Sequence, residues 1–153
     1  MLHTRLEELY QFAPYISDPA NVEQLHNMRI AAKRLRYTLE IFAPCFSGKE
    51  FDKISAQAKT IQEQIGEIHD CDVRRPLLQA FLESRAGGRP EIRPGLEKLI
   101  QSQQAERDAL YRKFIVSWNK LQKQGFKRQF LLMLAQSEDA SESVTTEESV
   151  PNP

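Results

Sequence analysis

Length, composition and charge point to a single globular domain and exclude a membrane-spanning protein. The 153 residues are enough to bury a sizeable core, and a composition that is 41% hydrophobic and 27% charged is ordinary for a globular chain. No apolar run approaches the length of a membrane span, and the polar N-terminus does not resemble a signal peptide, so we expect a cytoplasmic protein.

The formal net charge of zero conceals an uneven distribution. Residues 138–153 contain five acidic residues and no lysine or arginine, which leaves 16 of the 21 acidic residues against 21 basic ones in residues 1–137. The body of the protein therefore carries about +5 and can attract an anionic partner. We expect residues 136–153 to form an acidic disordered tail, which either aids solubility or competes weakly for the basic surface.

Apolar residues recur at helical spacing through most of the chain, and no stretch shows the alternation of a strand. This pattern predicts an all-α fold, in which residues 1–135 form an antiparallel bundle of four long helices with short flanking helices. In chain order, we expect helices over residues 5–16, 21–43, about 47–70, 73–84, 94–125 and 126–135, with a loop at 86–90.

Capping signals place several of the predicted helix boundaries. The pairs with the spacing of a capping box are Asn21 with Gln24 and Ser47 with Glu50. Phe46 can pack on Phe51 as a hydrophobic staple at the second of these starts. Further on, Asp70 or Asp72 can begin a separate helix, because Pro76 would then lie in a first turn, where proline is tolerated.

The helix predicted over residues 21–43 carries two different stripes. One is an apolar stripe at the spacing of a bundle seam, formed by Leu25, Met28, Ala32, Leu35, Leu39 and Phe42. The other consists of His26, Arg29, Lys33 and Tyr37, with Arg36 at its edge and Arg34 on a flank. Four cations and no acid lie between Met28 and Leu39, whereas a surface helix usually mixes both signs. The basic stripe is therefore either a solvated face or a surface that donates to phosphate oxygens.

The next helix has an apolar seam of its own, formed by Ile54, Ala58, Ile61, Ile65 and Ile68. A flank of Lys59, Gln62 and Gly66 runs beside this seam, with His69 where the two meet. A glycine within a helix costs about 1 kcal/mol relative to alanine, so Gly66 indicates a close approach. Two helices that present cations to one groove favour an extended polyanion over a single phosphate.

The helix predicted over residues 94–125 contains a cation on its apolar face. That face is formed by Leu96, Leu99, Ile100, Leu110, Phe114, Trp118 and Leu121. Gln103 and Arg107 fall within the same sector. Because a guanidinium stays charged, Arg107 either extends past its neighbours or points at an anion.

The sequence shows no constellation built for catalysis or for metal binding. His26 has a single carboxylate, Glu23, one turn away, which is too few ligands for a metal site. Cys45 and Cys71 lack metal-ligand spacing, and we expect buried or half-buried free thiols. There is no Gly-rich phosphate loop, nucleophile elbow or HExxH motif. We therefore expect a non-enzymatic protein that has no cofactor and no metal.

Two segments resemble the signatures of the CHAD family, the conserved histidine α-helical domain. The first is Leu25-His26-Asn27-Met28-Arg29-Ile30, continued by Lys33-Arg34-Leu35-Arg36. The second is Ile65-Gly66-Glu67-Ile68-His69-Asp70-Cys71-Asp72-Val73. Their order and separation also match, and the resemblance covers about residues 5–135. One departure is His69, because family members more often have arginine at this position.

The resemblance implies an all-helical domain that binds inorganic polyphosphate through a basic surface and catalyses no reaction. It also implies an association with polyphosphate granules as one cytoplasmic location. The residues that the two motifs place at the binding surface are His26, Arg29, Lys33, Arg34, Arg36, His69 and Asp70. Helical position adds Tyr37, Lys59 and Arg107.

Family domains contain two pseudo-symmetric bundles, whereas this chain has material for one. We therefore expect a homodimer in which two basic stripes line one channel. An adaptor that binds nucleic acid or an acidic protein through the same stripe is the alternative, although only Tyr37 is an aromatic residue interleaved with the bases. A phosphohydrolase that uses His26 or His69 is a third and less favoured interpretation.

Overall fold

The structure is a computed structural model that describes residues 1–46, 48–84 and 89–145, with side chains up to Gln136. The described residues form five α-helices and one 3₁₀ turn, and they contain no strand. The prediction of an all-α fold is therefore confirmed. The helices are α1 (Leu2–Tyr10), α2 (Val22–Phe42), α3 (Lys49–Glu83), α4 (Arg93–Lys123) and α5 (Phe126–Thr145), and the 3₁₀ turn is η1 (Ala43–Cys45).

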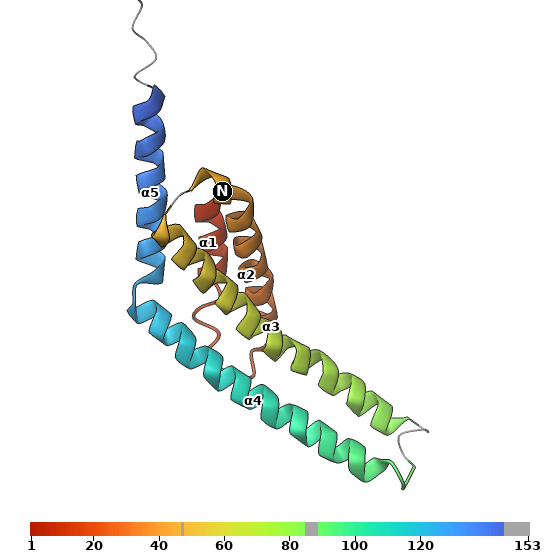
Figure 1. The fold of residues 1–153 in the computed structure, drawn as a ribbon. Coiled ribbons are helices and arrows are strands. Elements are labelled where there is room, and N and C mark those ends of the chain that lie inside the picture. Colours follow the sequence, from red (N-terminus) through yellow and green to blue (C-terminus); the bar gives the residue numbers. More distant parts are fainter. Residues whose placement is uncertain (47, 85–88, 146–153) are drawn as a thin grey trace, which may run out of the picture.

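Helix α3 lies in the middle of the fold, with α2 packed on one side and α4 on the other (Figure 1). Helix α3 runs antiparallel to α2 and to α4. Along α2 and α3, His26 meets His69 and Arg36 meets Gln62, so residue numbers rise on one helix as they fall on the other. Helix α1 packs on α2, and the first turns of α5 close the end of the bundle.

The predicted apolar seams form the core. Met28, Leu35 and Ile65 are completely buried, as are the two phenylalanines at the start of α5, Phe126 and Phe130. The seam of α2 and the seam of α3 face each other, and the aromatic side chains of α4 complete the core. The core fixes how α2 and α3 are rotated about their own axes, and it therefore also fixes which side chains remain outside along their shared edge.

The structure corrects the predicted break after residue 70, because α3 runs without interruption from Lys49 to Glu83. Pro76 lies inside the helix, where a proline removes one backbone hydrogen bond and costs about 3 kcal/mol. Contacts with α4 hold α3 in line on both sides of this position. Before it, Asp72 pairs with Arg107 instead of capping a new helix, and after it Leu82 is buried.

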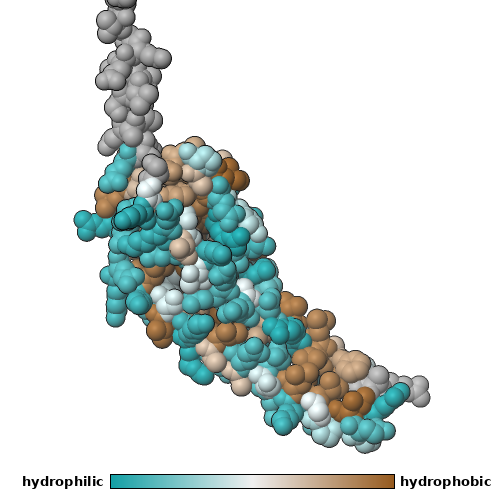
Figure 2. All heavy atoms as spheres, viewed as in Figure 1, coloured by the Kyte–Doolittle hydropathy of each residue, from teal (hydrophilic) through white to brown (hydrophobic). Residues whose placement is uncertain are grey.

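Beyond the bundle, the end of α3 and the start of α4 project together as a two-helix arm, past the ends of α1 and α2 (Figure 1). Apolar residues gather on the surface of this arm (Figure 2). Leu99 is 44% exposed and Leu77 is 66% exposed, because no third helix covers them. The apolar face predicted for this helix is therefore buried only in part, because Leu99 on it is exposed whereas Phe114 and Trp118 are buried.

The helices begin close to the predicted residues, but the predicted side-chain capping bonds are not always formed. Asn21 is the N-cap residue of α2, yet its side chain makes no capping bond and instead donates from Nδ2 to the carbonyl oxygen of Tyr15 (2.8 Å). The N-cap of α3 is Gly48, whose φ of +114° suits glycine. The predicted staple is confirmed, because the rings of Phe46 and Phe51 stack with centroids 5.0 Å apart. Ser47 lies outside the described residues.

The ends of the chain differ from the predicted boundaries. Helix α1 ends at Tyr10, six residues before the predicted end, and a series of turns follows. Helix α5 continues past Ala135 to Thr145, so the first part of the predicted disordered tail is helical. Residues 146–153, and residues 86–88 of the predicted loop, lie outside the described residues. The two thiols also differ, since Cys71 is buried as expected but Cys45 is exposed at the end of η1.

Candidate functional site

The predicted basic residues of α2 and α3 lie along the edge that the two helices share. We use the name basic edge for the side chains of His26, Arg29, Lys33, Arg36, Lys59, Gln62 and His69. The apolar seams on either side turn inward, so this polar row is left at the surface. It extends along α2 from His26 to Arg36, which is about 15 Å of helix.

One end of the basic edge is a pair of imidazoles. The Nδ1 atoms of His26 and His69 lie 3.2 Å apart, and the ring centroids are 4.7 Å apart. One ring must donate and the other must accept, so the pair in this geometry carries a proton on only one of the two nitrogens. Burial lowers the pKa of His69, and the nearby Arg29 and His26 lower it further. The neutral form of His69 is therefore favoured in the free protein.

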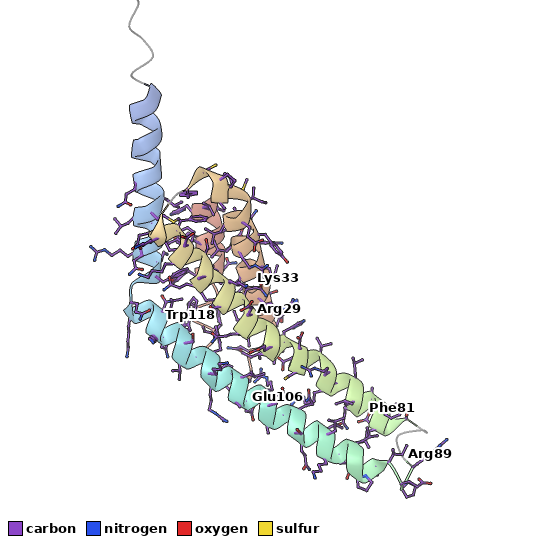
Figure 3. The ribbon with its side chains drawn as sticks, viewed as in Figure 1. Arg29, Lys33, Phe81, Arg89, Glu106 and Trp118 are labelled. Atoms are coloured by element: carbon purple, nitrogen blue, oxygen red, sulfur yellow. The ribbon has the colours of Figure 1, made fainter. Side chains whose placement is uncertain are left out.

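The middle of the basic edge is formed by Arg29 and Lys33, which lie on successive turns of α2 (Figure 3). Both side chains are half-buried, and neither has an ion-pair partner within the described part of the chain. The Nε atom of Arg29 is buried and has no hydrogen-bond acceptor among the described residues. An unsatisfied buried donor costs about 1–3 kcal/mol, and more when it is charged. This atom therefore requires an acceptor that the described chain does not provide.

Arg36 differs from these two cations because its own chain engages it. Its Nε donates to Glu40 (2.8 Å), and its Nη1 donates to Gln62 across the α2–α3 edge (2.5 Å). The hydrogen bond to Glu40 raises the pKa of the guanidinium, so Arg36 stays charged. Its guanidinium also lies over the exposed Tyr37 ring, 5.2 Å from the centroid. Arg36 is thus fixed in orientation and partly neutralised.

The far end of the basic edge opens into a hollow of about 240 Å³ between α2 and α3. Arg36 and Lys59 contribute its cations, and Glu40 contributes the carboxylate that pairs with Arg36. Ser55 contributes a buried hydroxyl oxygen that has no partner among the described residues. Lys59 forms only a long and exposed ion pair with Glu63, at 3.8 Å. Such a pair is weak, so the lysine can exchange its partner for a bound anion.

Gly66 lies beside this row, but it does not mark the close helix approach that we expected. A Cβ atom built at Gly66 would meet only the side chain of Gln62, at 3.9 Å, which is ordinary contact. The described structure therefore contains no backbone or core group that requires a glycine here. Because Gly66 has no side chain, there is open space next to the middle of the basic edge.

Arg107 takes no part in the basic edge. Its side chain is only 8% exposed, and its Nε donates to Asp72 (2.8 Å) while its Nη2 donates to the carbonyl oxygen of Pro19 (2.9 Å). Nearby, the Tyr111 hydroxyl donates to the carbonyl oxygen of Ile16 (2.6 Å). These bonds attach the α1–α2 connection to α4. The anion to which Arg107 points is a carboxylate of the second motif, which gives Arg107 and Asp72 a structural role.

Arg34 also lies away from the other cations. It is exposed on α2, and because it stands two residues from Arg36 it lies about 160° around the helix from it. Only its backbone oxygen is engaged, as the acceptor of the Thr38 hydroxyl (2.7 Å). Arg34 therefore faces away from the edge shared with α3. This position agrees with the flank that helical spacing predicted for Arg34. Its inclusion among the residues of the binding surface came only from the resemblance of the motif.

Ser55 and Gln62 are functional candidates that the sequence did not identify as ligands. Gln62 was predicted only as part of a polar flank, and its bond to Arg36 depends on the pairing register of α2 and α3. Among the described residues, no group of three or more His, Cys, Asp or Glu side chains could hold a metal ion. None of the described helices is both long and apolar enough to span a membrane.

The chain belongs to the CHAD domain family, whose pattern matches residues 1–79. This match includes α1, α2 and α3 as far as Gln79, and it therefore contains every residue of the basic edge. It is shorter than the resemblance to residue 135 that the sequence suggested. Comparison with curated proteins and comparison with solved structures each find no match.

Proposed function

We propose that this protein binds inorganic polyphosphate along the basic edge and does not catalyse a reaction on it. The observation that carries the proposal is the buried, unpartnered Nε of Arg29 between a histidine pair and further cations. A phosphate oxygen is a strong acceptor for a guanidinium N–H, and its negative charge offsets the cations around it. CHAD domains as a family bind polyphosphate, which supports the same ligand class.

The shape of the basic edge favours a chain over a single phosphate. Its cations are distributed along about 15 Å of α2, so one orthophosphate could contact only a part of them. Each contact with an exposed phosphate is weak, but counterion release makes a series of contacts strong and dependent on salt. Affinity should therefore increase with phosphate chain length and fall as salt is added.

We further propose that two copies of the chain pair, so that two basic edges contribute to one channel. A single edge leaves one side of a bound phosphate chain in solvent, and a two-fold partner would supply cations to that side. Light scattering with and without polyphosphate tests this arrangement. A mass of one chain, unchanged by saturating polyphosphate, would exclude pairing and leave binding by a single edge.

An adaptor for single-stranded nucleic acid is the competing proposal. Tyr37 is 47% exposed beside the basic edge, and an exposed aromatic ring can stack on a base. The Arg36 guanidinium already occupies one side of this ring, which weakens that interpretation. Competition between polyphosphate and single-stranded RNA of equal charge separates the two, since an adaptor should prefer the RNA.

The deciding experiment is a binding titration with orthophosphate, short polyphosphate and long polyphosphate at several salt concentrations. We expect no measurable binding of orthophosphate, increasing affinity with chain length, and a steep loss of affinity with salt. The length of the polymer should be unchanged after prolonged incubation with a divalent cation. If long polyphosphate does not bind at low salt, the proposed function is wrong. If the polymer is shortened, the proposal of a non-enzymatic protein is wrong.

A further inference from the structure

A second basic groove lies on the other side of α3, between α3 and α4. It has a volume of about 340 Å³ and is separate from the edge shared with α2. Its polar lining includes Lys53 and Thr60 of α3 and Ser117 and Lys120 of α4. Figure 1 shows that α3 runs between α2 and α4, so the groove and the hollow described above lie on different sides of α3. This groove lies at the bundle end of the two helices, far from the arm.

The groove is positively charged. Two lysines contribute to its lining and no carboxylate does. Lys53 donates to a neutral acceptor, Oε1 of Gln129 (3.0 Å), and Lys120 forms no ion pair within the described part of the chain. The Oε1 atom of Gln57 is buried in the lining without a partner among the described residues. An amide oxygen only accepts hydrogen bonds, so this atom needs water and not a phosphate oxygen. The anionic ligand is indicated by the two lysines, which no carboxylate of the lining neutralises.

The groove and the hollow share one lining residue, Ala56. This residue lines the groove with Lys53 and Lys120, and it also lines the hollow with Arg36 and Lys59. Ala56 is exposed, and its small side chain projects little from the surface of α3 between the two spaces. Cations therefore lie on both sides of α3 at this point, along the basic edge on one side and in the α3–α4 groove on the other.

We infer that a long polyphosphate chain continues from the basic edge, crosses α3 at Ala56 and occupies the groove between Lys53 and Lys120. This inference rests on the proposed function. It adds a second binding segment to the basic edge, and it explains why the protein should bind long polyphosphate chains more tightly than short ones. Short chains occupy the basic edge alone. Chains long enough to cross α3 bind both segments at once, and the second segment then binds at a high effective concentration.

The test compares two double variants that each remove two positive charges from the protein. The first is Lys53→Gln with Lys120→Gln in the groove. The control is Lys98→Gln with Arg112→Gln, at exposed positions of α4 that do not line the groove. We expect the groove variant to bind long polyphosphate about tenfold more weakly than the control, with a salt slope reduced by about 1.4. Both variants should bind short chains equally.

A third variant, Ala56→Glu, places a carboxylate at the crossing on an exposed helix position. It should lower the affinity for long chains to that for short chains. If the groove variant and the control bind long chains equally while loss of Arg29 and Lys33 still weakens binding, the crossing is wrong and the proposed function stands. If the unmodified protein retains no polyphosphate of any length, both proposals are wrong.

Discussion

The Nδ1 atoms of His26 and His69 face each other across the α2–α3 edge at 3.2 Å, and this distance allows only one proton between them. Each histidine comes from one of the two CHAD signatures, so the pair joins the motifs in space. A second proton would place two N–H groups against each other next to Arg29. The free protein therefore opposes protonation of His69, and a bound polyanion would favour it.

Polyphosphate binding should strengthen as the pH falls. Burial and the nearby Arg29 lower the pKa of His69 below 6.5 in the free protein, whereas a row of phosphates would raise it again. Binding near this pKa therefore takes up a proton, and affinity for long chains should increase several-fold between about pH 7.5 and pH 5.5. Isothermal titration in buffers of different ionisation enthalpy measures the proton uptake directly.

The matched control for this prediction is the third histidine of the chain. His69→Gln should remove most of the pH dependence, whereas His3→Gln should leave it unchanged, because His3 is exposed on α1, a helix that contributes no residue to the basic edge. Without ligand, the lowered pKa of His69 has the opposite effect on folding. Stability is fully present above about pH 6.5 and falls as the pH passes down through the folded-state pKa. An affinity that is constant with pH would contradict this account of the pair.

Gly66→Ala should make the protein more stable and its polyphosphate binding weaker. A Cβ atom at Gly66 meets nothing closer than 3.9 Å, so alanine gains its helix propensity of about 0.5–1 kcal/mol without a clash. The same methyl group would occupy the space beside the basic edge, where we expect phosphate oxygens. Thermal unfolding and a binding titration on the same sample measure the two effects.

The informative result is the difference in sign between the two effects of Gly66→Ala. Gly95→Ala is a suitable comparison, because Gly95 lies in the first turn of α4 with open space around it and is far from the basic edge. It should change stability slightly and leave binding unchanged. If Gly66→Ala lowers stability, the glycine serves the fold and not the ligand.

Asp72→Asn should destabilise the fold strongly, because Arg107 would lose the carboxylate that neutralises it. The two side chains are 10% and 8% exposed, and breaking a buried ion pair costs about 3–5 kcal/mol. Urea denaturation measures this loss. The control is Arg93→Gln, which breaks an exposed pair with Glu97 on the same helix and should cost less than about 1 kcal/mol. Similar losses in both variants would show that the Asp72–Arg107 pair is not a structural connection.

Much of the fold could be predicted because burial follows periodicity. The seams of α2 and α3 were predicted from spacing, and all the residues on them except the half-buried Phe42 are buried, because each helix must cover its apolar side. Burial in the arm could not be predicted in this way. Leu99 has the same helical position as buried residues further along α4, but its exposure depends on where α1 and α2 end, and a single helix does not contain that information.

The site was predictable in part for a similar reason. The basic residues of α2 share a face through local geometry, so Arg29 and Lys33 could be placed from the sequence. The role of Arg107 could not, because its partner Asp72 lies 35 residues away and meets it only once α3 and α4 pack antiparallel. The sequence showed that Arg107 lies within the apolar sector of its helix. This position indicated that an anion lies opposite the guanidinium, but it did not show that the anion is Asp72.

The most direct test of the account is the salt dependence of polyphosphate binding in two charge-matched variants of α2. One variant carries Arg29→Ala, and the other carries Arg34→Ala on the opposite side of the same helix. We expect Arg29→Ala to lower affinity and to reduce the slope of log affinity against log salt by about 0.7, the amount for one lost phosphate contact, while Arg34→Ala leaves the slope unchanged. Equal slopes and equal affinities in the two variants would contradict the central claim that the edge between α2 and α3 is where the polymer binds.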